Sequence, residues 1–141
     1  MFRGKLGYMP ISPIYTKTFT IPKSSIDENG HVNNVAYVQW MQDIAVEHYD
    51  SIGGIKAQGP DATWVIREHK IEYLLSAFEG EEIEIRTWVE NIRKVRSLRK
   101  YEFVRKADGR LLVKGETDWV FVDIKTGGPQ AIPKEVINVF E

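Results

Sequence analysis

The spacing of apolar residues changes along the chain and predicts distinct kinds of segment. Residues 14–21 place apolar side chains mainly on one face and threonines on the other, which is typical of a β-strand. From Asn33 to Ser51 the apolar positions follow a helical period, and Gly53-Gly54 favours a stop. Polar residues form only a narrow stripe on this helix, at Gln39, Asp43, Glu47 and Asp50. A helix that is apolar over most of its circumference is usually enclosed, so we expect it at the centre of the domain.

The chain beyond this helix has the pattern of strands separated by turn signals. Four segments are rich in strand-forming residues: 63–76, 82–92, 97–106 and 110–123. The second alternates cleanly, whereas the first alternates poorly. Asp108-Gly109 predicts a two-residue hairpin turn, and Pro133 suits the first position of a short C-terminal helix. A helix packed on one antiparallel sheet predicts an α+β domain, and the sheet's edge favours an oligomer.

Composition narrows the class of protein. The chain has 141 residues, 43% of them hydrophobic, which predicts one folded domain over residues 1–141. Nineteen basic residues nearly cancel twenty acidic ones, so no strong positive field for nucleic acid is expected. With no cysteine, disulfides, thiolate metal sites and cysteine nucleophiles are excluded. Glycines and prolines interrupt the N-terminal apolar residues, and no 18-residue apolar run occurs. We therefore expect a cytoplasmic enzyme or binding module that does not enter a membrane.

One polar loop concentrates the candidate chemistry. The stretch Asp27–Asn34 supplies a carboxylate, the His31 imidazole and three carboxamides, and it runs directly into the predicted helix. A carboxylate beside the N–H groups of a helix start can perform chemistry on a carbonyl. On the residues alone, Asp27 is equally suited to capping a turn before the helix.

The loop and the order of elements together resemble a known family. The segment Asp27–Tyr37, followed by Trp40 and Trp119–Asp123, resembles hotdog-fold thioesterases of the 4-hydroxybenzoyl-CoA thioesterase class. Asp27–Asn34 is also similar to the loop motif of plant-type acyl-ACP thioesterases. The resemblance covers nearly the whole chain and implies a hotdog fold, in which an antiparallel sheet of about five strands wraps one long helix. It also implies a homodimer or homotetramer whose sheets join edge to edge, with active sites at the subunit boundary.

The resemblance implies hydrolysis of an acyl-CoA or acyl-ACP thioester without a dissociable cofactor. Asp27 matches the catalytic aspartate, as general base on water or as nucleophile. The backbone N–H of Asn34 is the expected oxyanion donor, and Asn29 and His31 are expected to support the attacking group. The side chains of Asn33 and Asn34 are equally suited to capping the helix. Plant-type enzymes carry a further Glu in the next strand, whereas Ser76 stands near that position here, which favours a simpler mechanism centred on aspartate.

Several residues are candidates for substrate binding. Asn33 is one expected substrate contact. Four residues are candidates for lining an acyl pocket, although each equally suits a core or an interface: Tyr37, Trp40, Met41 and Trp64. Five cations fall within eight residues at a strand boundary: Arg93, Lys94, Arg96, Arg99 and Lys100. Of these, Arg93, Lys94 and Arg96 are our candidates for the phosphates of coenzyme A or an acidic carrier protein. A solvated basic hairpin is the competing interpretation.

Other polar residues carry weaker expectations. Glu47 shares the polar stripe of the helix, which favours a solvated carboxylate, although some hotdog enzymes take a catalytic carboxylate from this helix. His48 falls on the apolar side and is expected to be a buried structural residue, and the pattern does not place His69. No ligand spacing indicates a metal site. Two rival functions stay open: a hotdog dehydratase or hydratase using His31 and Glu47 across a dimer, and a non-catalytic module that binds acyl thioesters.

Overall fold

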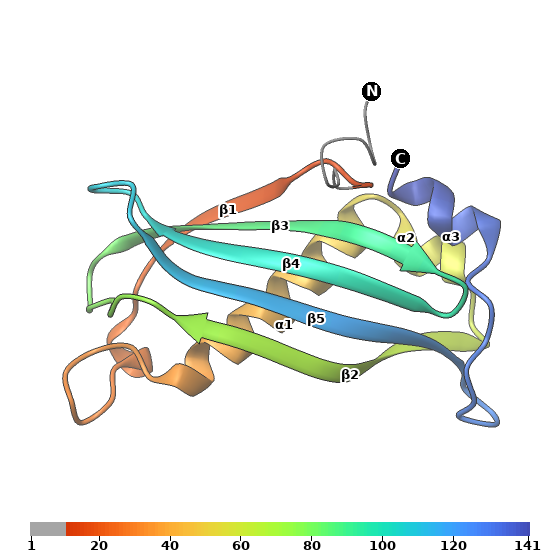
Figure 1. The fold of residues 1–141 in the computed structure, drawn as a ribbon, viewed down its shortest axis with the longest axis horizontal. Helices are drawn as coiled ribbons and strands as arrows, with labels where there is room; N and C mark the ends of the chain where they lie inside the picture. The colour runs from red at the N-terminus through yellow and green to blue at the C-terminus, as the bar shows by residue number, and fades with distance from the viewer. Residues whose placement is uncertain (1–10) are drawn as a thin grey trace.

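A computed structural model describes residues 11–141, so most of the N-terminal segment that glycines and prolines interrupt lies outside the described residues. The strands are β1 (Tyr15–Thr20), β2 (Ala62–Tyr73), β3 (Glu82–Arg93), β4 (Arg96–Arg105) and β5 (Leu111–Asp123). The helices are α1 (Asn34–Ser51), α2 (Gly54–Gln58) and α3 (Lys134–Val139), with a 3₁₀ turn η1 at Lys23–Ser25. The strands form one antiparallel sheet in the order β1-β3-β4-β5-β2, and α1 crosses one of its faces (Figure 1). The expected α+β hotdog fold is therefore confirmed.

The core lies between α1 and the inner face of the sheet. The helix buries Tyr37, Met41, Ile44, Ala45, His48 and Tyr49. The sheet contributes alternate residues, as in β3, where Ile83, Ile85, Thr87 and Val89 are all at most 3% exposed. Helix and sheet approach closely at Gly115, where an added Cβ would lie 2.9 Å from the Met41 side chain. The clean alternation predicted for β3 is confirmed, and it sets which side chains face the helix.

Three local predictions differ from the structure. Strand β2 ends at Tyr73 rather than at residue 76, and a register shift between Ile66 and Glu68 explains its poor alternation. The predicted two-residue hairpin is wrong, because β4 ends at Arg105 and β5 begins at Leu111. The Asp108 carboxylate bonds to side-chain and main-chain groups on both sides of this wider turn. A short helix, α2, also follows the predicted glycine stop.

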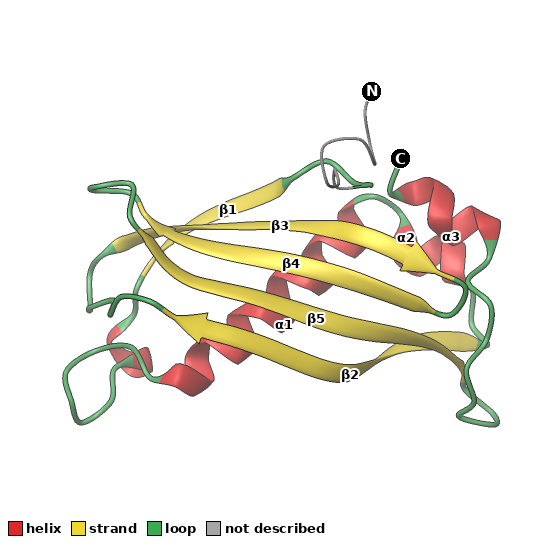
Figure 2. Ribbon diagram, viewed as in Figure 1, coloured by secondary structure: helices red, strands yellow, loops and turns green. Residues whose placement is uncertain are grey.

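The loops gather at the two ends of the sheet (Figure 2). One end holds the loop that leads into the start of α1. The other end holds α2 and α3 together with the turn between β3 and β4. The two ends of α1 thus face different surroundings, and each has its own cavity.

Candidate active site

The loop before α1 is a tight turn closed by its own backbone. The Asp27 N–H donates to the His31 carbonyl at 3.0 Å, and the Gly30 N–H donates to the Asp27 carbonyl at 3.0 Å. Gly30 has φ +82°, which a residue with a Cβ adopts only with strain. The Asn29 N–H donates to Asp27 Oδ1 at 2.9 Å, so this carboxylate braces the turn. The turn-capping interpretation of Asp27 therefore describes a contact that is present, and it leaves the second carboxylate oxygen available.

The carboxylate and the imidazole of the loop lie close together. His31 Nδ1 is 4.0 Å from Asp27 Oδ1, and the two side chains are 36% and 23% exposed. The same ring nitrogen lies 3.5 Å from the Val32 carbonyl. Both functional groups therefore reach solvent while the backbone beneath them is held fixed.

The start of α1 has one capped N–H group and one unpartnered N–H group. Asn33 is the N-cap, and its Oδ1 accepts from the Val35 N–H at 2.9 Å, so the capping interpretation of this side chain is confirmed. The Asn34 N–H has no hydrogen-bond partner among residues 11–141. It is the first N–H of an 18-residue helix, where the dipole favours negative charge.

A cavity of about 110 Å³ lies beside this helix start. Its walls are His31, Val32, Asn34, Tyr37, Tyr73, Leu74, Leu75, Ser76 and Ala77. Burial raises the pKa of Tyr37 to about 12, with Glu81 and Tyr73 adding to the effect. Its buried hydroxyl has no hydrogen-bond partner among residues 11–141 and stays a neutral donor. Sequence patterning missed Tyr73, Leu74 and Leu75 as lining residues, because they stand at the end of β2 and just beyond it, where no strand periodicity marks them.

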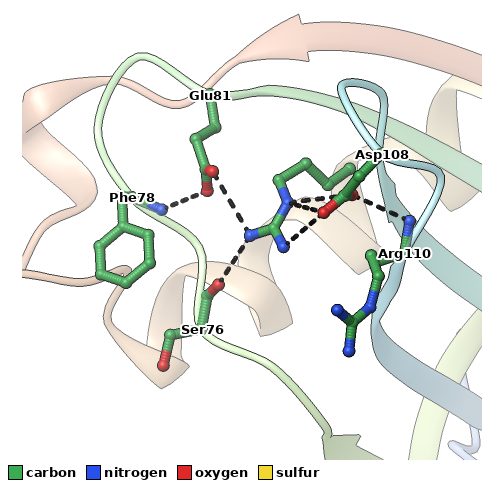
Figure 3. Close-up of polar contacts among 6 residues, drawn as sticks. Ser76, Phe78, Glu81, Asp108 and Arg110 are labelled. Atoms are coloured by element: carbon green, nitrogen blue, oxygen red, sulfur yellow. Dashed lines mark hydrogen bonds and ion pairs between the residues drawn. The ribbon is translucent and has the colours of Figure 1, made fainter.

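A charged cluster holds the far wall of this cavity in place. Arg105 Nη1 donates to the Ser76 carbonyl at 3.5 Å and to Glu81 Oε2 at 3.4 Å, and the other side of the guanidinium binds Asp108. Glu81 Oε1 accepts from the Phe78 N–H at 2.8 Å, as Figure 3 shows. The turn between β4 and β5 is therefore tied to the segment that follows β2.

The other expected substrate contacts lie elsewhere within one chain. Trp40 packs against Phe19 and Tyr37 with ring centroids 4.8 Å and 5.4 Å apart. Trp64 lies near the start of β2, where it contacts Phe121 and lines a second cavity. Neither residue lines the cavity beside Asn34, so a single chain does not gather the predicted acyl contacts at one place.

The five cations do not form one patch. Arg93 and Lys94 stand at the turn between β3 and β4, at the opposite end of the sheet from Asp27. Arg96 is paired with Asp118, its Nε donating to Oδ1 at 3.2 Å. Arg99 points inward and is only 4% exposed, while Lys100 lies 3.5 Å from Glu116. Strand alternation separates them, because Arg99 shares its phase with buried Tyr101 and Phe103.

The remaining polar candidates are engaged in structural contacts. Glu47 pairs with Lys17 at 3.1 Å. His48 is buried as expected, and its Nδ1 accepts from Arg99 Nη1 at 2.9 Å because a guanidinium can only donate. Burial, with Arg99 second, lowers the pKa of His48 to about 4. His69 lies on β2, 2.9 Å from Thr117 Oγ1, and burial lowers its pKa. The described chain, residues 11–141, brings no three His, Cys, Asp or Glu side chains together as a metal site.

No helix within residues 11–141 is both long and apolar enough to cross a membrane.

Comparisons with known proteins agree with this architecture. A 1,4-dihydroxy-2-naphthoyl-CoA thioesterase from Synechocystis has a similar structure, with a TM-score of 0.80, 14% identity, and coverage of 91% of this chain and 96% of that one. A probable thioesterase from Escherichia coli has a TM-score of 0.77 at 16% identity, covering 88% and 94%. An acyl-ACP thioesterase from Bacteroides thetaiotaomicron has a TM-score of 0.81 at 22% identity, covering 90% of this chain and 52% of that longer one.

These three likenesses establish the fold. No curated protein matches the sequence. The sequence model of the thioesterase-like superfamily matches residues 21–140, which includes the loop, α1 and all of the sheet except β1. The chain therefore belongs to the thioesterase-like superfamily.

Proposed function

We propose that this chain hydrolyses an acyl-CoA thioester, with acyl-ACP as the second choice, to a free acid and a thiol. The observation that carries the proposal is the geometry at the start of α1. There the Asp27 carboxylate and the His31 imidazole lie 4.0 Å apart across one tight turn, and His31 and Asn34, whose N–H has no partner among residues 11–141, line a cavity. Membership of the superfamily supports this class of reaction. Similar structures named for CoA and ACP thioesters support the choice of bond.

The chemistry needs an attacking group and a stabilised oxyanion. As general base, Asp27 takes a proton from water while the water oxygen adds to the thioester carbonyl carbon. The carbonyl oxygen becomes negative and accepts a hydrogen bond from the Asn34 N–H. When the C–S bond breaks, the thiolate recovers the proton from Asp27. As nucleophile, an Asp27 oxygen would instead add to the carbonyl carbon and expel the thiolate, forming an anhydride. Water then cleaves the anhydride and supplies the proton that the thiolate takes up. In either case His31, at 4.0 Å, orients the carboxylate.

Replacement of Asp27 tests the proposal. We expect Asp27→Asn and Asp27→Ala to lower thiol release on the order of 10³-fold, because both attacking routes need the carboxylate. The measurement is a thiol-release screen over a panel of acyl-CoA and acyl-ACP substrates. Asp43→Asn is the matched control, since Asp43 is an exposed carboxylate on α1 whose one hydrogen bond within residues 11–141 is accepted from Gln39. Turnover near that of the unmodified chain in both Asp27 variants would contradict the mechanism.

Two further readouts separate the open alternatives. Single turnover in H₂¹⁸O places the label in Asp27 only if the carboxylate is the nucleophile. Interconversion of enoyl and hydroxyacyl groups without free thiol would identify a hydratase, and binding without turnover would identify a binding module.

We also propose that two copies join along β2. This edge strand has 12 residues, against six in β1 at the other edge, and it leaves Val65 44% exposed. Tyr73 and Leu74 are 44% and 46% exposed at its end. Antiparallel pairing of two such strands brings the Ala62 end of one chain to the Tyr73 end of its partner. That arrangement would bring Trp64, Arg93, Lys94 and Arg96 of one chain toward the Asn34 end of the other.

Oligomeric state tests this second proposal. By light scattering after gel filtration, we expect a dimer or a tetramer for the unmodified chain and a smaller species for Val65→Lys. Ile124→Lys is the control, because Ile124 is 54% exposed in the turn after β5. A monomeric unmodified chain would overturn the edge-to-edge assembly.

A further inference from the structure

A second cavity lies at the far end of α1 from Asp27. It has a volume of about 260 Å³ and sits among α1, α2, α3 and strands β2, β4 and β5. Its apolar walls include Tyr49, Trp64, Trp119 and Phe140. No residue among 11–141 lines both this cavity and the one beside Asn34. At 1.5 Å per residue, Ala45 on its wall is about 16 Å along the helix from Asn34. Of the predicted substrate contacts, Trp64 lines this cavity, and within one chain the proposed hydrolysis uses no other residue of it.

A buried cation without a counter-ion lies in the wall of this cavity. Arg99 is 4% exposed, and only its Nη1 is engaged, donating to His48 Nδ1 at 2.9 Å and to Thr87 Oγ1 at 3.1 Å. Its Nε and Nη2 have no partner within residues 11–141, and no carboxylate of that range lies within 4.0 Å. Both engaged acceptors are neutral, since the pKa of His48 is lowered to about 4. An uncompensated buried charge is costly, so the free edge of this guanidinium is suited to an anion.

The other polar groups of the cavity are mainly hydrogen-bond donors. The indole Nε1 atoms of Trp64 and Trp119 are buried without a well-aligned hydrogen bond. Trp64 lies close to the Tyr49 hydroxyl and Trp119 close to the Tyr101 hydroxyl. Burial raises the pKa of each phenol, and the neighbouring indole lowers it by a smaller amount. Gln58 is already used twice, accepting from the Tyr49 hydroxyl and donating to the Ala62 carbonyl. The cavity therefore offers donors and apolar surface to a ligand, and no negative charge.

We propose that this cavity binds a small organic carboxylate with an apolar or aromatic body. The carboxylate accepts two parallel hydrogen bonds from Nε and Nη2 of Arg99, the geometry in which guanidinium and carboxylate match best. The apolar body lies against Trp64, Trp119 and Phe140. Acids of this class are also what the proposed hydrolysis releases, but direct binding depends on neither turnover nor assembly.

Calorimetric titration of the full chain tests the site. The probes are benzoate, 2-naphthoate and octanoate, each compared with its primary amide, which has the same shape and no charge. We expect at least one acid to bind at least tenfold more tightly than its amide. Arg99→Met keeps most of the side-chain volume and is expected to abolish this preference. Equal binding of acid and amide, or binding of none of the acids, would overturn the proposal.

A second variant keeps the test decisive if Arg99→Met does not fold. Val46 lines the cavity and is 54% exposed, so it stands at the mouth. Val46→Trp leaves Arg99 intact and is expected to weaken the acid at least tenfold by filling the entrance. Ile124→Trp is the control, since it adds the same indole at a residue of equal exposure outside the cavity. Unchanged affinity in Val46→Trp would show that the acid binds elsewhere.

Discussion

The two ends of α1 hold their polar groups in different ways. At the start, Asp27 and His31 are four residues apart, and the turn between them is closed by its own backbone. At the end, Arg99 reaches His48 across 51 residues of chain, and the contact is buried between helix and sheet. The start therefore exposes its functional groups at little cost in desolvation. The end of α1 lies against the charged Arg99 side chain in the protein interior, and the whole fold is needed to hold that charge there.

The contrast predicts that changes at the end of α1 cost more stability than changes at its start. Altering the polar groups near Asp27 should cost little in the free energy of unfolding, because water replaces the hydrogen bonds that are lost. Groups around His48 cannot be replaced by water, because the core encloses them. The predictions that follow test this difference in order of decreasing effect.

The largest loss of stability is expected for Gly54→Ala, next to the end of α1. A Cβ at this position would lie 2.1 Å from the Tyr49 ring. Tyr49 belongs to a buried cluster, and its hydroxyl donates a hydrogen bond to Gln58 Oε1. We expect a loss of about 3 kcal/mol in the free energy of unfolding, measured by urea titration. Gly53→Ala is the matched control. It has φ +87° and open space, so only backbone strain of about 1 kcal/mol applies. Equal losses of unfolding free energy in Gly54→Ala and Gly53→Ala would contradict the role given to the close contact with Tyr49.

Acid should weaken the fold through His48. Its pKa is about 4 in the folded chain against an ordinary value of 6.5, so between these values the unfolded chain binds the extra proton. Stability is therefore full above pH 6.5 and falls as the pH is lowered toward 4, by about 2 kcal/mol at pH 4.5. His69, whose pKa is also lowered, acts in the same direction. Urea titrations at pH 7 and 4.5 measure the loss. His48→Gln should remove most of it, and an unchanged loss in that variant would contradict the assignment.

The smallest effect is expected at the start of α1. Asn33→Ala removes the cap on the Val35 N–H and should cost about 1 kcal/mol. Asn33→Asp keeps the acceptor and should retain stability close to that of the unmodified chain. A loss of more than about 3 kcal/mol in the free energy of unfolding of Asn33→Ala would contradict the expectation that changes at the start of α1 cost less stability than changes at its end. Thiol release measured on both variants reports separately on the predicted substrate contact of Asn33.

Periodicity and one contiguous motif were sufficient to predict the fold and the candidate loop. The helix was predicted because its apolar stretch is long and ends at glycines, and β3 because Ile83 to Val89 alternate without interruption. Strand β2 was harder, since a bulge after Ile66 changes which face each residue occupies. The prediction for the Asp108 turn was wrong because β4 ends at Arg105 and β5 begins at Leu111, and the Arg105–Asp108 ion pair within this turn is a side-chain contact that has no periodicity in the sequence.

The second cavity could not be predicted from any single stretch of sequence. Arg99 stands among four other cations, and that context favoured a surface patch. Only its strand phase, shared with Tyr101 and Phe103, indicated the interior. Its partners come from α1 and β3, and the cavity walls come from six elements. A site assembled in this way becomes visible only when the elements are placed in space.

The ion cluster at Arg105 gives a means of engineering the molecule. One guanidinium joins the turn between β4 and β5 to the Ser76 wall of the cavity beside Asn34. We expect a change of length or sequence in that turn to alter the position of this wall, which also accepts a hydrogen bond from the Val32 N–H through the Ala77 carbonyl at 2.9 Å. Libraries confined to residues 106–110 therefore offer a route to altering the cavity beside Asn34.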